Sequence, residues 1–450
     1  MWLAWRSLSH RPRDGFYVRS KITATITAMA RFLIPRSCAR CIITVALFSF
    51  GVLFLSTAFS LTTQMGSRDT FGVSAIEELG QRCSWYQDYV HAHQENLAKL
   101  RRQDSDVRLL VYDCRNGYCG GLGDRLGGIA SLFYVSVLLE RSLVIYHTKP
   151  VLLSYTFLPN HDINWDVAEL IPNQVQEIYL NLVDKYSLDD LNTLFNAEHA
   201  DIPIMRVTLN GYFTGASLWN SQHSLRPWFL GGMNRTHHAL CGKWRSHTVG
   251  SSFALAFNIL FRPSEHVLTR KSEMLQALGL DTTQGGSLQY VAIHGRLGGE
   301  SKTSNNVAAW NDPSRDTLSD IPKFVKCARE KANTNSDTNT TAIILVSDNQ
   351  EFKVKSSRLH PEIKSITDTL LFHVDRSSGD HKTSLAGSID AVAEFLILSE
   401  ADCLVASRST FSGAASALRN FRGGHACYYH FNSCDKLISD FWLEATPKLT

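Results

Sequence analysis

Three apolar runs in the second half of the chain, at residues 289–294, 342–346 and 403–407, are each followed directly by a short loop of Arg, Ser, Asp or Gly residues. Runs of this length that alternate with helical patterns predict parallel strands buried on both faces. In an open α/β sheet, ligands bind at the carboxyl ends of the strands, where loops and helix N-termini offer N–H donors. The pattern therefore predicts a site for a phosphorylated ligand such as a nucleotide sugar.

The rest of the chain after residue 105 indicates two blocks of this kind. Strands predicted at 107–112 and 143–146 flank a glycine-dense loop and an apolar helix, which together form a parallel-sheet unit. In the second block, the apolar runs alternate with three expected helices, at 316–333, 349–358 and 386–401. A further strand is expected at 370–374. Because 450 residues usually exceed one core, we expect two domains, at 106–284 and 285–450.

The N-terminal part has the pattern of a membrane anchor. Residues 1–40 contain eight basic residues and one acidic residue, and 41–62 is almost wholly apolar and uncharged. A helix of this length can cross a bilayer core of about 30 Å, and the basic flank favours a cytosolic N-terminus. We expect a cytoplasmic tail at 1–40, a single span at 41–62, a stem at 63–105 and a lumenal remainder. A cleaved signal peptide is the alternative, and the start could be Met1 or Met29.

Charge and cysteine content narrow the class of protein. The net charge is only +3, and the basic excess lies in the tail, which argues against a nucleic-acid partner. Eight cysteines follow the apolar run without a zinc-binding spacing, so disulfides in an oxidising lumen are the better interpretation. The pairs Cys114–Cys119 and Cys427–Cys434 are close enough in sequence to close local loops, although the sequence leaves the pairing open. Cys403, inside an apolar strand, is expected to be a buried free thiol.

The glycine-dense segment 119–128 is the first candidate binding element. It follows a strand and begins a helix, and Gly121 and Gly123 would let the backbone approach a ligand closely. Asp124 and Arg125 would then stand at the helix N-terminus, facing the ligand. A tight structural turn is an equally simple explanation of the glycines.

The second candidate element follows the strand at 289–294. Arg296 can offer a bidentate fork to a diphosphate and so neutralise its charge without a metal. His294 could bind a ribose or phosphate oxygen, and Glu300, the carboxylate of this loop, is a candidate general base. A surface turn with incidental charges is the alternative.

The third candidate element extends from Glu394 to Ser412. Asp390 and Glu394 lie four residues apart on one helix face, and the strand at 403–407 leads to Ser409 and Thr410, whose hydroxyls and amides could bind an anion. Capping of the next helix by Ser409 would explain the same residues.

Asp348, at the end of the strand at 342–346, is a weaker candidate, because it could equally well cap the following helix. We expect no metal, because no pair of acidic residues follows a strand. Arg side chains and backbone amides must then offset the charge of a diphosphate.

Together, the three elements resemble the superfamily of α1,2-, α1,6- and protein O-fucosyltransferases. The family's His-x-Arg loop is similar to His294-Gly-Arg296, and the continuation Arg-Leu-Gly-Gly-Glu resembles the loop of the bacterial Nod-factor α1,6-fucosyltransferase. The glycine segment is similar to Gly-Leu-Gly-Asn-Arg of plant cell-wall fucosyltransferases, with Asp124 in place of Asn. The segment from Glu394 to Phe411 resembles the family's late motif, in which the first acidic residue is usually Asp.

The resemblance implies a GT-B-like α/β fold with two Rossmann-like domains facing a cleft, the first on the acceptor side and the second binding GDP-fucose. It implies that Arg296 binds the β-phosphate, that His294 helps to hold the nucleotide and that Glu394 contacts guanine. Ser409, Thr410 and Phe411 would line the phosphates. No metal or other cofactor is implied.

The resulting hypothesis is a single-pass type II Golgi membrane protein that moves fucose from GDP-fucose to a glycan or glycoprotein acceptor, with inversion. Glu300 or Asp124 would take the acceptor proton. The alternatives are a transferase of the same fold with another nucleotide sugar, and a non-catalytic Golgi glycan-binding protein. Acceptor, linkage and oligomeric state are left open.

Overall fold

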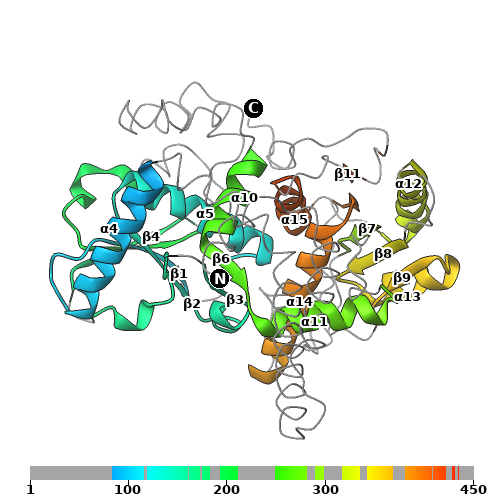
Figure 1. The fold of residues 1–450 in the computed structure, drawn as a ribbon, viewed down its shortest axis with the longest axis horizontal. Helices are drawn as coiled ribbons and strands as arrows, with labels where there is room; N and C mark the ends of the chain where they lie inside the picture. Colours follow the sequence, from blue (N-terminus) through cyan, green and yellow to red (C-terminus); the bar gives the residue numbers. More distant parts are fainter. Residues whose placement is uncertain are drawn as a thin grey trace, which may run out of the picture. The chain divides into compact units, whose positions relative to one another are not determined.

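The computed structural model describes thirteen segments of the chain: 84–115, 119–160, 162–172, 175–182, 193–210, 249–280, 289–297, 317–334, 342–367, 381–407, 409–421, 428–430 and 434 (Figure 1). All of them belong to one compact unit, Ser74–Thr450. The expected tail and span, and the stem as far as residue 83, lie outside the described residues. In the part that is described, no helix has the length and apolar character needed to cross a bilayer.

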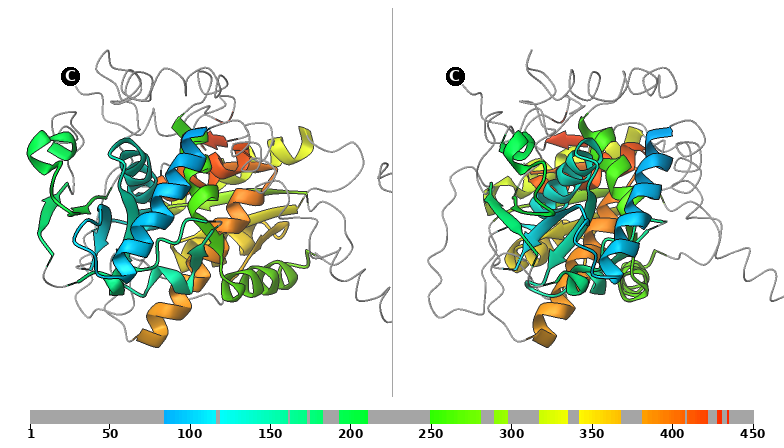
Figure 2. Two further views of the ribbon diagram at one scale, coloured as in Figure 1. Left: turned by 60° about the vertical axis from the view of Figure 1, so that its left-hand side comes forward. Right: turned by 90° about the vertical axis from the view of Figure 1, so that its left-hand side faces the viewer.

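The first sheet is wholly parallel, in the order β2-β1-β5-β4. Its strands are β1 (Leu109–Cys114), β2 (Ser142–His147), β4 (Glu177–Asn181) and β5 (Ile204–Thr208). The C-terminal part of helix α4 (Ser84–Arg101) packs on one face of this sheet through Leu97 and Leu100, and α5 (Leu122–Leu138) packs on the other face (Figure 2). The N-terminal half of α4 contacts α5, where the Tyr89 ring packs on Phe133. The expected strand–helix–strand unit is therefore present, with β1 beginning two residues later than predicted.

The second sheet is also parallel, in the order β11-β10-β7-β8-β9. Its strands are β7 (Tyr290–Gly295), β8 (Ala342–Ser347), β9 (Ile363–Ser365), β10 (Cys403–Ala406) and β11 (Tyr428–His430). The helices of this half are α12 (Ile321–Thr334), α13 (Gln350–Leu359), α14 (His381–Glu400) and α15 (Thr410–Phe421). All three apolar runs form strands as predicted. The strand expected at 370–374 lies outside the described residues, and β9 was not foreseen.

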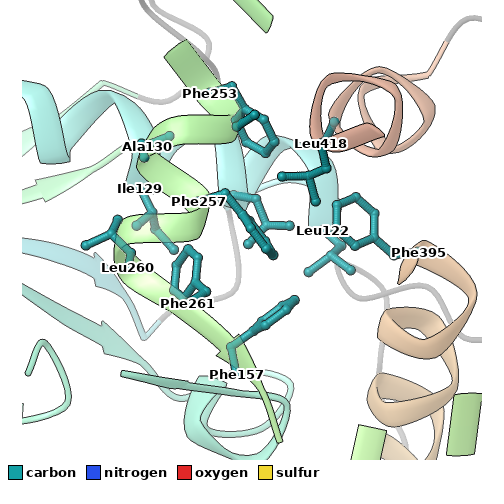
Figure 3. Close-up of a cluster of buried hydrophobic side chains, with 14 of the residues drawn as sticks. Leu122, Ile129, Ala130, Phe157, Phe253, Phe257, Leu260, Phe261, Phe395 and Leu418 are labelled. Carbon is teal, nitrogen blue, oxygen red and sulfur yellow. The ribbon is translucent and has the colours of Figure 1, made fainter. Parts of the chain in front are cut away.

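An aromatic core connects the helices of the two sheets. Between the sheets in sequence lie α10 (Val249–Leu260), β6 (Phe261–Pro263) and α11 (Glu265–Ala277). Strand β6 pairs antiparallel with β3 (Phe157–Pro159), which lies between β2 and β4 in sequence. Phe257 on α10 contacts Phe157 and Phe261 at ring-centroid distances of 5.4 and 5.3 Å, and it also reaches Phe395 on α14 at 6.0 Å. Figure 3 shows these rings in one cluster with Ile129 of α5 and Leu418 of α15. Because the core is shared, the loops of one sheet are positioned by the packing of the other.

The N-terminus of α5 approaches the start of α15 very closely at Gly123. A Cβ atom on Gly123 would lie 2.4 Å from the carbonyl carbon of Thr410 and 2.5 Å from the amide nitrogen of Phe411. No real side chain tolerates such distances to backbone, so the contact requires glycine. This glycine serves helix packing, where the sequence predicted close approach to a ligand.

Two disulfides fall within the described residues. Cys114–Cys119 closes the loop between β1 and α5, as expected. Cys327 on α12 is bonded to Cys434, so the expected Cys427–Cys434 pairing is wrong. Cys403 is buried but disulfide-bonded, so the expectation of a free thiol is also wrong. The first error arises because a pairing across 107 residues depends on how α12 packs, which sequence spacing does not reveal.

The contact at Gly123 predicts the effect of adding one methyl group. Gly123→Ala should lower the free energy of unfolding by about 1–3 kcal/mol, because α5 and α15 must separate to admit the Cβ. Urea titration followed by circular dichroism measures this. The control is Gly121→Ala, whose Cβ would meet only the Asp124 carboxylate, at 3.5 Å. Equal stability of the two variants would contradict the assignment.

Candidate functional site

The candidate site lies where three neighbouring strands of the second sheet end. Strand β7 lies between β10 and β8, and His294 is in register with Ala406 on one side and Val346 on the other. The residues that follow these strands therefore lie side by side at one edge of the sheet. The first and third predicted elements also meet here, because the Gly123 contact brings the glycine segment against Thr410.

Ser407 and Ser347 fix the backbone at the end of β7 from both sides. The Ser407 N–H and hydroxyl both donate to the His294 carbonyl, each at 3.0 Å, and the same hydroxyl accepts the Arg296 N–H at 2.7 Å. On the other side, the Ser347 hydroxyl donates to the Gly295 carbonyl at 2.8 Å. The segment that carries Arg296 is thus held by hydrogen bonds from both neighbouring strand ends.

Asp348 orients the Arg296 side chain. Its Oδ2 lies 3.0 Å from Nη1 of Arg296, and its Oδ1 accepts the Leu297 N–H at 2.9 Å. Asn349, and not Asp348, caps α13, by accepting the Phe352 N–H at 2.8 Å. Of the two roles that the sequence left open for Asp348, capping belongs to Asn349, and contact with ligand stays a prediction. The Arg296 side chain remains 22% exposed, so the guanidinium is oriented by protein and still reaches solvent.

His294 is buried beside this pair as a neutral imidazole. Its Nδ1 lies 2.6 Å from the Ser412 hydroxyl, and its ring packs against Phe411 at a centroid distance of 5.2 Å. Burial lowers the pKa of His294 to about 4; the charge of Arg296 acts in the same direction and that of Asp348 opposes it. At neutral pH the ring therefore has one N–H donor and one acceptor nitrogen, and the bond to Ser412 occupies Nδ1.

The late motif begins helix α15. The Ser409 hydroxyl accepts the Phe411 N–H at 3.3 Å, so Ser409 caps the helix, as the alternative interpretation held. Phe411 lies between His294 and Phe395, with the second ring at 5.5 Å. A capped helix N-terminus still carries partial positive charge, so Ser409 and Thr410 lie where an anion is favoured.

Glu394 forms a buried ion pair with Lys353. Lys353 Nζ lies 2.9 Å from Oε1 of Glu394, and the lysine side chain is only 1% exposed. Burial raises the pKa of Glu394, and the charge of Lys353 opposes that rise. Asp390, one turn earlier on the same helix face, binds Arg270 of α11 at 2.6 Å. The face predicted from the four-residue spacing is thus confirmed as acidic, and each carboxylate has a cationic partner.

The glycine segment differs from its prediction at Arg125. Arg125 is 1% exposed; its Nε donates to the Gly120 carbonyl at 2.8 Å, and Nη1 contacts His147 Nε2 at 2.7 Å and the Lys149 carbonyl. The guanidinium is therefore turned into the protein, where it joins the β1–α5 loop to the end of β2. Arg125 was expected to face the ligand, and helical register alone could not show that its partners lie behind it.

Asp124 is directed toward its own helix. Its Oδ2 accepts the Gly121 N–H at 3.0 Å, so the carboxylate binds the N-cap amide at the start of α5. Gly121 is the N-cap residue, in an extended conformation that any residue can adopt. These contacts fix the glycine segment beside α15 and leave the Asp124 side chain only partly buried.

Three residues of the site, Ser407, Ser412 and Lys353, were not among the predicted ones. Ser407 and Ser412 are in the motif that the sequence singled out, and the alternation of strand residues could have shown Ser407 at the strand end. Lys353 is an ordinary helix residue in sequence, so only the packing of α13 on α14 reveals it. Glu300 lies outside the described residues. Within the described segments, no group of three or more His, Cys, Asp or Glu residues could hold a metal ion.

Comparisons with known proteins place the chain near one group of solved structures. No family model and no curated protein matches it. An Arg-to-Lys mutant of Arabidopsis thaliana FUT1 in complex with GDP is 16% identical, with 75% of this chain and 77% of that chain covered and a TM-score of 0.48. NodZ α-1,6-fucosyltransferase soaked with GDP-fucose is 15% identical (69% and 92% covered, TM-score 0.40). POFUT1 in complex with GDP is 15% identical (72% and 99% covered, TM-score 0.36).

These neighbours are fucosyltransferases, the superfamily that the sequence motifs resemble.

The lowered pKa of His294 predicts a pH dependence of stability. An unfolded histidine has a pKa of about 6.5, so between pH 6.5 and 4 the unfolded chain binds a proton that the folded chain does not. The free energy of unfolding should therefore decrease as the pH is lowered through this window. The loss due to this residue should be on the order of 2 kcal/mol at pH 5, relative to neutral pH. His294→Gln should reduce that loss in urea unfolding at pH 7.5 and 5.0. An identical pH dependence in the variant would show that His294 titrates normally.

Proposed function

We propose that the protein is a GT-B-like, metal-independent glycosyltransferase that moves fucose from GDP-fucose to a hydroxyl of a glycan or glycoprotein. The observation that carries the proposal is the position of Arg296: it ends the central strand of a parallel sheet, is oriented by Asp348 and Ser407, and lies beside the His294–Phe411 pair. A His-x-Arg segment at the carboxyl edge of a parallel sheet supports the proposal, because nucleotides bind at that edge.

The proposed role of Arg296 is to stabilise the departing diphosphate. Negative charge develops on the β-phosphate as the bond to the sugar breaks, and a pre-oriented guanidinium stabilises that charge without reorganising. The N-terminus of α15, capped by Ser409, adds the partial positive charge of its backbone N–H groups. His294 would hold the nucleotide through its second ring nitrogen, because Nδ1 is bound to Ser412.

The proposed reaction is a single displacement. The acceptor oxygen forms a bond to the anomeric carbon from the face opposite the diphosphate, while the bond from that carbon to the β-phosphate oxygen breaks and its electrons leave with GDP. A β-linked donor thereby gives an α-linked product. The acceptor proton passes to a carboxylate, for which Asp124 and Glu300 are the candidates. The packing of Gly123 on Thr410 favours a position of Asp124 near the reaction.

The Lys353–Glu394 pair is the proposed guanine contact. Guanine presents two donors, N1–H and N2–H₂, beside the acceptor O6. A carboxylate next to an ammonium group offers the complementary acceptors and donor. Burial raises the pKa of Glu394, because the charged carboxylate is unfavourable away from water. N–H donors of a bound guanine would therefore stabilise the charged carboxylate.

We infer that this transfer takes place in the Golgi lumen, with the chain anchored as a type II membrane protein through 41–62. Two features support this location: the uncharged apolar run after a basic segment, and the disulfides Cys114–Cys119 and Cys327–Cys434, which require an oxidising compartment.

Removal of the Arg296 guanidinium tests the mechanism. Arg296→Ala should lower kcat for fucose transfer on the order of 10²-fold, because the developing diphosphate charge loses its oriented partner. Release of GDP from GDP-fucose by the full-length protein is the measurement. Arg329→Ala is the matched control, since Arg329 pairs with Glu362 on the surface and should leave kcat unchanged. Full turnover by Arg296→Ala would reject the mechanism.

The preference for guanine over other nucleobases can be tested by thermal shift. GDP should raise the Tm of the full-length protein by several degrees at concentrations well above its Kd, and UDP should raise it less, because uracil lacks the paired donors of guanine. The Glu394→Gln variant should show a smaller difference between the Tm increases produced by GDP and by UDP. If UDP and GDP stabilise the wild-type protein equally, the guanine assignment is wrong and a transferase with another donor is favoured.

A further inference from the structure

One face of the first sheet changes from apolar to polar toward β5 and β4 and toward the ends of β1 and β2. Under α4 this face is apolar, with Leu109, Val111, Val144 and Ile204 in one core. Because alternate strand residues share a face and parallel partners lie in register, the same face continues into charged, hydroxyl and aromatic residues. These are Asp113, Tyr146, Glu177, Tyr179, Arg206 and Thr208. We refer to these six residues, with Arg115, as the polar edge.

The charges of the polar edge balance one another. Arg206 Nε donates to Oε2 of Glu177 at 2.6 Å, and Arg206 Nη1 lies 3.7 Å from Oδ2 of Asp113. Arg115 Nε donates to Oδ1 of Asp113 at 2.8 Å, and its Nη2 contacts Oδ2 of the same carboxylate. Two guanidinium groups thus face two carboxylates. A phosphate or sulfate would meet as many negative charges as positive ones, so an anionic ligand gains little here.

Aromatic rings and hydroxyls complete the polar edge. The Arg115 guanidinium lies 4.9 Å from the ring centroid of Tyr146. The Tyr179 hydroxyl lies 2.5 Å from Oγ1 of Thr208, which donates to the Asp113 carbonyl at 2.8 Å. Tyr179 is nevertheless 50% exposed, so its ring forms an open apolar surface beside fixed polar groups. Such a combination is typical of sites that bind ligands with both apolar and hydroxyl-bearing faces.

Arg206 has a buried donor that the protein does not satisfy. The side chain is 9% exposed, and its Nη1, although 3.7 Å from Oδ2 of Asp113 and so ion-paired, has no hydrogen-bond partner among the residues that the structure describes. Buried donors are nearly always paired, and an unpaired one is a site where a ligand oxygen or a water is expected. This observation is independent of the arrangement of charges and aromatic rings, and it indicates a ligand with an acceptor oxygen.

We propose that the polar edge binds a neutral sugar of the acceptor. The inference rests on the proposed function, which requires an acceptor hydroxyl, and it adds the residues that would hold the acceptor. Sugar hydroxyls both donate and accept, so they match alternating guanidinium and carboxylate groups. The C–H face of a sugar ring matches the open ring of Tyr179. Asp113, Tyr146 and Thr208 lie at or next to the carboxyl ends of their strands, where ligands of parallel sheets bind.

Two exposed variants test the inference. Full-length protein is applied, without donor, to an array of neutral and sialylated oligosaccharides. Tyr179→Ala should weaken binding to neutral members about tenfold, the loss expected for one aromatic contact. Glu177→Gln should also weaken binding to neutral oligosaccharides, because the carboxylate that accepts from Arg206 loses its charge. Tyr155→Ala is the matched control: Tyr155 is another exposed tyrosine, 37% exposed and in contact with His381 of α14, and the variant should bind as the wild type does.

Several results would overturn the inference. Unchanged binding by both Tyr179→Ala and Glu177→Gln would do so, as would a wild-type protein that binds no neutral member. Binding confined to sialylated members and abolished by salt would identify an anion site instead. GDP affinity of the same variants, measured by thermal shift, should be unchanged. If the wild-type protein failed to bind GDP, the proposed function would fail while glycan binding to the polar edge could still be observed.

Discussion

The candidate site depends on the hydrogen bonds that hold the end of β7 between its two neighbours. Ser407 binds the His294 carbonyl and the Arg296 N–H, and Ser347 binds the Gly295 carbonyl. A flexible arginine with several rotatable bonds would lose much entropy on binding an anion. The fixed backbone and the ion pair to Asp348 remove part of that loss in advance. Preorganisation of one guanidinium is therefore the physical basis of the proposed chemistry.

Burial around this edge controls the charge state of the neighbouring groups. His294 is kept neutral because its imidazolium would be desolvated beside Arg296 and Lys353. The buried charge of Lys353 is compensated by its ion pair with Glu394. The positive charge of the site is thus concentrated on Arg296 and on the helix N-terminus of α15, which are the groups closest to an incoming diphosphate in the proposed complex.

The sequence predicted much of the second sheet because its strands are short, apolar and bounded by loop residues. It also predicted that Arg296 and the motif before α15 directly follow strands, and that His294 lies near the end of its strand, as the structure has them. It misplaced Arg125, whose guanidinium binds His147 and Lys149, and it assigned Gly123 to a ligand although the glycine serves the contact with α15. Both errors concern partners that are distant in sequence.

By itself, the sequence determined the alternation of strands and helices, the position of each functional loop at a strand end, and the resemblance to the fucosyltransferases. These follow from local periodicity and from residue types at fixed spacing. The tertiary structure alone decided the Cys327–Cys434 pairing, the Lys353–Glu394 ion pair and the polar edge of the first sheet. Each of these depends on which face of one element packs against another, and that choice is made by the core as a whole.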